Sequence, residues 1–119
     1  MRRLLLVLLG CAVLGAALGW FLTRPAALDP DYGSDLSADA EAGALIFAAG
    51  GCVSCHAVPK SEGEAQLVLA GGLAFPSDFG TFYAPNISPH PTHGIGDWTL
   101  PQFARALTEG VSPAGQHYY

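Results

Sequence analysis

The sequence predicts an all-α chain in which an N-terminal transmembrane helix precedes a small domain of short helices and long irregular loops. Three observations support this fold class. Nineteen residues from Leu4 to Leu22 carry no charge, two later stretches have helical patterns with clear end signals, and prolines and glycines interrupt any regular pattern in residues 59–96. As a helix, the apolar stretch would be about 28 Å long, close to the roughly 30 Å hydrocarbon core of a bilayer.

Residues 1–23 are predicted to form an uncleaved membrane anchor. Arg2 and Arg3 precede the apolar run. Because basic residues stay on the cytoplasmic side, we expect a single-pass protein of a bacterial inner membrane with its domain facing the periplasm. A cleaved signal peptide is one alternative, although its apolar region is usually shorter. A lipoprotein signal at Cys11 is another, and it fits less well because the apolar run continues past that cysteine.

The anchor is followed by a linker, residues 24–35, and then by a domain that occupies residues 36–119. The linker contains prolines and little periodicity. The domain is short for a stable hydrophobic core without a covalent link or a cofactor. From Asp29 onward the chain has ten acidic residues and only two basic ones. This balance argues against nucleic acid as a partner.

The first helix of the domain is predicted over residues 40–49. Ser37 is the expected N-cap, and the acidic residues Asp39 and Glu41 suit the positive end of the helix dipole. The glycine pair at 50–51 is expected to end this helix directly before a cysteine motif.

A second helix is predicted to begin after Thr99 and to stop at Gly110. Thr99 and Gln102 have the spacing of a capping box, and Pro101 stands in the first turn, where its missing N–H is harmless. Residues 59–96, between the two helices, follow no regular pattern. So much irregular chain in one small domain is unusual, and a large cofactor that supplies the core would explain it.

The segment GGCVSCHAVP, residues 50–59, carries the most specific chemical signal. Two residues separate Cys52 from Cys55, and His56 follows directly. A thioredoxin-type disulfide needs a βαβ context that the sequence lacks. A structural zinc site needs four ligands, but the sequence has no second cysteine pair, and His56 directly after Cys55 is poorly placed to bind the same ion. Haem attachment uses all three residues: the two thiols form thioethers with the porphyrin, and His56 binds the iron as the proximal axial ligand. We therefore predict one covalently attached haem c.

With this motif, the chain resembles the class I c-type cytochromes. More narrowly, it is similar to the cytochrome c subunits of membrane-bound alcohol and gluconate dehydrogenases. The matching stretches are AEAGALIFAAGGCVSCHAVP, AGGLAFPSDFGTFYAPNIS, GIGDWTLPQFARALTEGV and GQHYY. The resemblance implies an all-helical class I cytochrome c domain around one haem, in which Gly43 and Phe47 pack against a C-terminal helix. It also implies a distal methionine ligand shortly after GQHYY.

The only methionine is Met1, in front of the apolar segment. The distal ligand is therefore not present in this chain, and we expect the domain to be truncated at its C-terminal end. His90 and His93 lie in a proline-rich loop and are expected to be exposed rather than to bind iron. His117 is expected to be structural. By its similarity to an element of small cytochromes c, Pro85 is expected to accept a hydrogen bond from His56.

Other side chains are assigned to the surroundings of the haem or to the surface. Arg105 is expected to be a solvated surface charge, with a haem propionate as its alternative partner. The aromatic residues expected to form the haem wall and core are Phe75, Phe79, Phe82, Tyr83 and Trp98.

The predicted function is electron transfer by the haem, in a periplasmic respiratory chain or dehydrogenase complex. The chain itself is not expected to be an enzyme, because no nucleophile–base pair or carboxylate dyad is visible. The expected partners are a dehydrogenase and an oxidase or quinone-linked complex. Two alternatives remain: a haem subunit with an open distal site in peroxidase-like or thiosulfate-oxidising catalysis, and a haem-based sensor.

Overall fold

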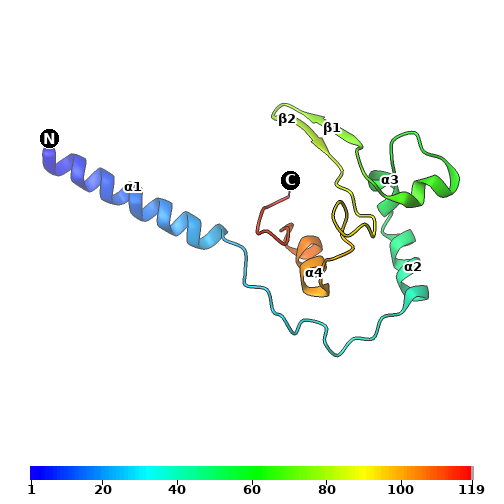
Figure 1. Ribbon diagram of the computed structural model, residues 1–119. Helices are drawn as coiled ribbons and strands as arrows, with labels where there is room; N and C mark the ends of the chain where they lie inside the picture. Colours follow the sequence, from blue (N-terminus) through cyan, green and yellow to red (C-terminus); the bar gives the residue numbers. More distant parts are fainter. Residues whose placement is uncertain (119) are drawn as a thin grey trace.

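The computed structural model describes residues 1–118, so Tyr119 at the end of the GQHYY stretch lies outside the described residues. The chain has two parts joined by an extended segment (Figure 1). The N-terminal part is helix α1, Arg2–Thr23, which projects away from the rest of the chain and has no buried residue. In length and composition this helix could cross a membrane, as the apolar sequence predicts.

The second part contains short helices and one hairpin. In chain order its elements are α2 (Ala40–Ala49), α3 (Cys52–His56), the 3-10 helix η1 (Gly63–Val68), β1 (Ala74–Ser77), β2 (Gly80–Tyr83) and α4 (Leu100–Thr108). The two strands pair antiparallel, with Ala74 opposite Tyr83. Figure 1 shows this hairpin projecting from the region around α3.

The hairpin departs from the all-α expectation. Its second strand is rich in aromatic and β-branched residues, which favour extended backbone. Its turn is closed by Ser77, whose hydroxyl accepts the Phe79 N–H at 3.2 Å and donates to the Gly80 carbonyl at 2.8 Å. Pro76 is tolerated because a two-stranded sheet has only edge strands. The proline that suggested an irregular loop therefore lies within a strand.

The predicted N-terminal cap is correct for α4 and wrong for α2. The expected capping box of α4 is present: Thr99 Oγ1 accepts the Gln102 N–H at 3.4 Å, and Gln102 Oε1 accepts the Thr99 N–H at 2.8 Å. The prediction of Ser37 as N-cap of α2 is wrong, because the N-cap is Asp39. Its carboxylate accepts the Ala42 N–H at 3.0 Å, and its negative charge suits the helix dipole.

Few side chains of the second part are buried. Within residues 1–118, the buried residues are Ala84, Ser88, Val111 and Ser112, with Gly71. Leu45 and Ile46 of α2 are 75 % and 72 % exposed, and a side chain at Gly43 would meet no atom within 4 Å. The packing implied for Gly43 is therefore not formed by the described residues. So small an apolar core favours a domain that a ligand helps to stabilise.

Candidate functional site

Helix α3 carries the three residues of the predicted attachment motif. Gly51, with φ +65°, turns the chain between α2 and α3, so the helix ends where the glycine pair predicts. Cys52, Cys55 and His56 occupy positions i, i+3 and i+4, which lie on one side of a helix. Both cysteines are free; Cys52 is half-buried and Cys55 is exposed. The helix therefore presents two thiols and an imidazole in the same general direction.

His56 is oriented by a segment far away in the sequence. Its Nδ1 lies 2.8 Å from the carbonyl oxygen of Pro85, 29 residues later, so the predicted hydrogen bond is present. A carbonyl can only accept, and Nδ1 therefore carries the proton while Nε2 keeps a free lone pair. The bond also restrains the ring. An imidazole in this state can bind a metal ion through Nε2.

A glycine pair holds Pro85 against α3. The Gly71 N–H donates to the His56 carbonyl at 2.8 Å, and the Gly72 N–H donates to the Ala84 carbonyl at 2.9 Å. Gly71 has φ +72°, and a Cβ there would collide with the Ala84 and Pro85 carbonyl oxygens. Only glycine lets the chain pass so close to both segments. No sequence signal pointed to this role, because residues 59–96 follow no regular pattern.

His56 lies on the wall of a cavity of about 280 Å³. The rest of the wall comes from Pro85 and residues 86–98, from one face of α4, and from the end of the described chain. The large apolar side chains that line it are Ile87, Ile95, Trp98, Phe103 and Leu107. A mostly apolar cavity with one oriented imidazole suits a largely apolar cofactor that carries a metal ion.

Tyr118 lines the same cavity, although the sequence reasoning gave it no role. The only signal was its place in the GQHYY stretch. Its backbone N–H donates to the Gly110 carbonyl at 2.7 Å, which folds the chain back over α4. Partial burial raises the pKa of the Tyr118 phenol, because a phenolate would lose solvation. The phenol therefore stays neutral at physiological pH and is able to donate a hydrogen bond.

The ring of His90 is occupied by hydrogen bonds within its own loop. His90 Nδ1 accepts the N–H groups of Thr92 and His93, both at 3.1 Å. Since Nδ1 is then unprotonated, the proton of the neutral ring is on Nε2, and neither nitrogen is free to bind iron. Both histidines are exposed, as predicted. His117 is also exposed, and its backbone pairs with Val111 in an isolated bridge.

Comparison with known proteins gives a consistent result. No family model matches the chain. A "Diheme cytochrome c-type" protein of Cereibacter sphaeroides is 50% identical over 119 residues, which is 100% of this chain and 40% of the relative. The fructose dehydrogenase cytochrome subunit of Gluconobacter japonicus is 40% identical over 77 residues, 65% of this chain and 15% of the relative. The gluconate 2-dehydrogenase cytochrome c subunit of Pantoea cypripedii is 37% identical over 94 residues, 79% of this chain and 20% of the relative.

The chain is homologous to c-type cytochromes. The relatives agree with the resemblance seen in the motif and its flanking stretches. The chain spans less than half the length of each of these curated relatives, and at most 40% of it.

The predicted aromatic wall is only partly correct for this c-type cytochrome homologue. Trp98 lines the cavity, as expected. The other four aromatic residues lie on the β1–β2 hairpin and do not line it. Phe79, at the turn, is 95 % exposed. The physical reason is that a two-stranded hairpin has no second layer over its faces, so its aromatic side chains remain accessible.

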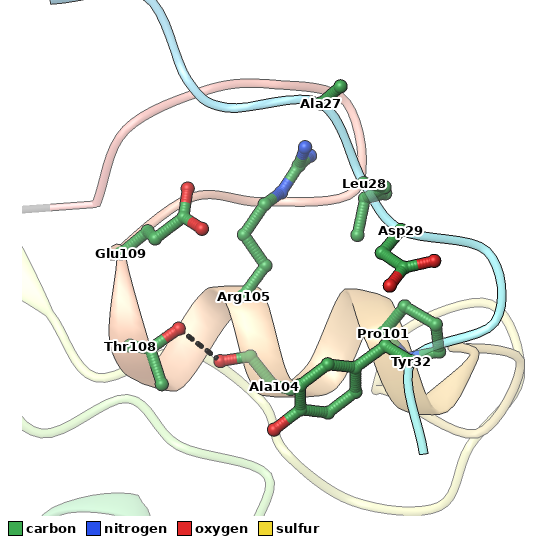
Figure 2. A pocket seen from close by; sticks show the side chains of 9 residues that line it. All are labelled: Ala27, Leu28, Asp29, Tyr32, Pro101, Ala104, Arg105, Thr108 and Glu109. Atoms are coloured by element: carbon green, nitrogen blue, oxygen red, sulfur yellow. Dashed lines mark hydrogen bonds between the residues drawn. The ribbon is translucent and has the colours of Figure 1, made fainter. Parts of the chain in front are cut away.

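Arg105 matches neither of its two expected roles. Its half-buried guanidinium donates to the Ala26 carbonyl at 3.3 Å and to the Ser112 carbonyl at 3.0 Å. Figure 2 shows it directed from α4 toward the linker, where it lines a separate cavity of about 190 Å³. The face of α4 that lines the His56 cavity carries Phe103 and Leu107 instead. Arg105 therefore fastens the linker to α4, which argues against a propionate partner.

Proposed function

We propose that this chain carries one covalently bound haem c and transfers electrons through it. The observation that carries the proposal is the hydrogen bond from His56 to Pro85, because it leaves Nε2 free to bind the iron. Two free thiols on the same helix support attachment. The motif occurs once in the sequence, which supports one haem in this chain. The homologous c-type cytochromes support the same assignment.

The residues present fit the group. Cys52 and Cys55 would form its two thioether bonds, and His56 would be the proximal ligand. When bound, haem supplies an iron that gains and loses one electron. The Pro85 carbonyl makes the His56 ring a stronger electron donor and restrains its rotation. With haem bound, the apolar side chains that line the cavity would limit the access of water to it, which disfavours the more highly charged oxidised state.

We further infer that α1 anchors the haem domain to the bacterial inner membrane, with the domain in the periplasm. The length and composition of α1 support this, as do Arg2 and Arg3 before it. At its other end, the Arg24 guanidinium lies 5.5 Å from the centre of the Trp20 ring and 4.5 Å from that of Phe21. Aromatic and basic residues of this kind are typical of the interface between bilayer and water.

The proposed partners are a dehydrogenase that donates electrons and an oxidase or quinone-linked complex that accepts them. The names of several relatives, which are cytochrome subunits of dehydrogenases, support the donor. They also support a carrier rather than a catalytic role. The excess of acidic residues after the anchor favours partners with a basic docking surface.

The test is haem attachment to the full chain, expressed with a cytochrome c maturation system. We expect a pyridine haemochrome assay to give one haem per chain, and haem-stained protein to stay in carbonate-washed membranes. The double variant Cys52→Ala/Cys55→Ala should lose all covalent haem, because no thioether can form. Cys11→Ala is the matched control, since it removes the third cysteine and should keep its haem.

Covalent haem on the double variant, or none on the matured wild type, would refute the attachment claim. Release of the haem protein from washed membranes would refute the anchor and leave the haem claim standing.

A further inference from the structure

The segment of residues 86–98 forms one wall of the cavity that His56 faces. One end of the segment contributes Asn86 and Ile87, and the other contributes Ile95 and Trp98. The Ile95 N–H donates to the Ser88 carbonyl at 2.9 Å and joins the two ends. Residues 89–94 form the turn between them and do not line the cavity. The positions of the wall residues therefore depend on how this turn is held.

Three side chains at alternate positions support the turn in the same way. Asn86, Ser88 and His90 each accept the backbone N–H two residues later, at 2.8, 3.4 and 3.1 Å. His90 Nδ1 also accepts the N–H of His93 at 3.1 Å. These bonds satisfy backbone donors that have no partner in a helix or strand.

The turn has little room for a different path. At Gly94 a Cβ would collide with the Ser88 carbonyl oxygen, so the backbone at Gly94 packs directly against the backbone at Ser88. Ser88 itself is buried. A turn packed this closely depends on its internal hydrogen bonds, and His90 supplies two of them with one atom.

His90 differs from the other two acceptors because a proton can remove its acceptor. The asparagine amide and the serine hydroxyl accept at any physiological pH, whereas an imidazole nitrogen accepts only while it is unprotonated. Histidine side chains ordinarily change charge between about pH 5 and 8.

The ring in contact with His90 belongs to another histidine. The ring of His93 lies 4.9 Å from the ring of His90 and is tilted by 40°. Within residues 1–118, His93 is the titratable side chain in ring contact with His90, and neither histidine forms an ion pair with a carboxylate. Both rings are exposed, so protons reach them freely.

We propose that neutral His90 is a positioning residue of the haem site: by accepting the Thr92 and His93 N–H groups, it keeps residues 86–98 in place as the cavity wall. Protonation of Nδ1 replaces the acceptor with a donor and breaks both bonds. The closed turn is therefore favoured above the ionisation range of histidine and loses this support as the pH falls through it. The effect on haem rests on the proposed function, whereas the effect on the turn does not.

The first test is backbone hydrogen exchange, measured by mass spectrometry on the full haem-loaded chain in detergent. In His90→Ala, the amides of Thr92 and His93 should lose roughly tenfold in protection, because two hydrogen bonds are removed. His90→Asn should keep most of it, since an asparagine accepts the N–H two residues later, as Asn86 does. His93→Asn is the matched control on the same turn, and it leaves the His90 acceptor in place.

The second test is the pH response of the same proteins. Between about pH 7.5 and 5.5, the wild type and His93→Asn should lose protection at residues 92–93 after correction for intrinsic exchange, while His90→Asn should not. Over that range the Soret circular dichroism, which reports the asymmetry of the haem surroundings, should change in the wild type and stay constant in His90→Asn.

Unchanged protection in His90→Ala, or equal pH responses of the wild type and His90→Asn, overturns the proposal. Loss of protection without any change in the Soret signal overturns the positioning role at the haem. If His90→Ala does not fold, the comparison of the wild type with His90→Asn still decides the question. Absence of covalent haem in the haemochrome assay would instead remove the proposed function, and the same exchange comparison on the haem-free chain would still test the turn.

Discussion

The His56 cavity has two supports that are built in different ways. The proximal support consists of α3, the glycine pair at 71–72 and Pro85, and its bonds join residues up to 29 positions apart. Helix α4, the other support, starts with a capping box between residues only three positions apart. The start of α4 can therefore form from its own sequence. The proximal support forms only when distant segments have come together. Its hydrogen bonds therefore depend on the tertiary fold, whereas the capping box of α4 does not.

Substitutions in the two supports should therefore have different effects. A substitution in the proximal support should change both the stability and the orientation of His56, which sets the properties of the iron. A substitution in α4 should lower stability and leave the His56 ring where it is. The reduction potential of the haem and the free energy of unfolding, measured together, distinguish the two.

The largest effect is expected for Gly71→Ala. The new Cβ would collide with the Ala84 and Pro85 carbonyls, and φ +72° disfavours alanine, so we expect a loss of about 2–4 kcal/mol in unfolding free energy. The displaced Pro85 carbonyl should also shift the potential. Urea denaturation and a redox titration measure the two effects.

Gly63→Ala is the matched control for this variant, because Gly63 also has positive φ, +57°, but has open space around it. It should cost about 1 kcal/mol and leave the potential unchanged. Equal stabilities of the two variants would contradict the role given to Gly71.

A smaller effect is expected for Arg105→Ala, which removes both bonds from α4 to the linker and to Ser112. We expect a loss of about 1–2 kcal/mol, an unchanged potential, and faster cleavage of the linker in limited proteolysis. Arg105→Lys should restore only part of the protection, since a single ammonium cannot span two carbonyls as a guanidinium does. The control is Lys60→Ala, an exposed basic residue. Unchanged linker cleavage in Arg105→Ala would argue against the attachment.

The smallest effect is expected for Thr99→Ala, which removes one half of the capping box. The loss should be about 1 kcal/mol in urea denaturation, with the potential and the haem spectrum unaltered. Thr99→Ser should recover most of the stability. A potential shift as large as that of Gly71→Ala would contradict the separation of the two supports.

The same contrast explains which features of the fold the sequence predicts. The start of α4 and the break between α2 and α3 depend on neighbouring residues, and both predictions agree with the structure. The N-cap of α2 is local as well, but Ser37 was expected there, and Asp39, two residues later, makes the bond instead. The hairpin aromatics, such as Phe79, were misplaced because residue type does not reveal which segments will be covered.

Within the site, chemistry predicts more than periodicity does. The roles assigned to Cys52, Cys55 and His56 follow from their spacing and reactivity alone, and they remain predictions. The Pro85 contact was expected from similarity to small cytochromes c. No sequence signal indicated that Gly71 would lie between two carbonyls or that His90 would accept two backbone N–H groups, because both depend on the path of a long loop.

The bond between Arg105 and Ala26 bears on how far the domain can travel. Fully extended, residues 24–39 would reach roughly 55 Å, whereas attachment at Ala26 leaves a free tether of about 10 Å after α1 ends at Thr23. With α1 in a bilayer, as proposed, the domain would search a thin layer along the membrane surface rather than a deep volume. Encounters with membrane-bound redox partners would then be frequent, and those with freely diffusing proteins would gain nothing from the tether. A single guanidinium would thus set the reach of the carrier and bias it toward neighbours in the same membrane.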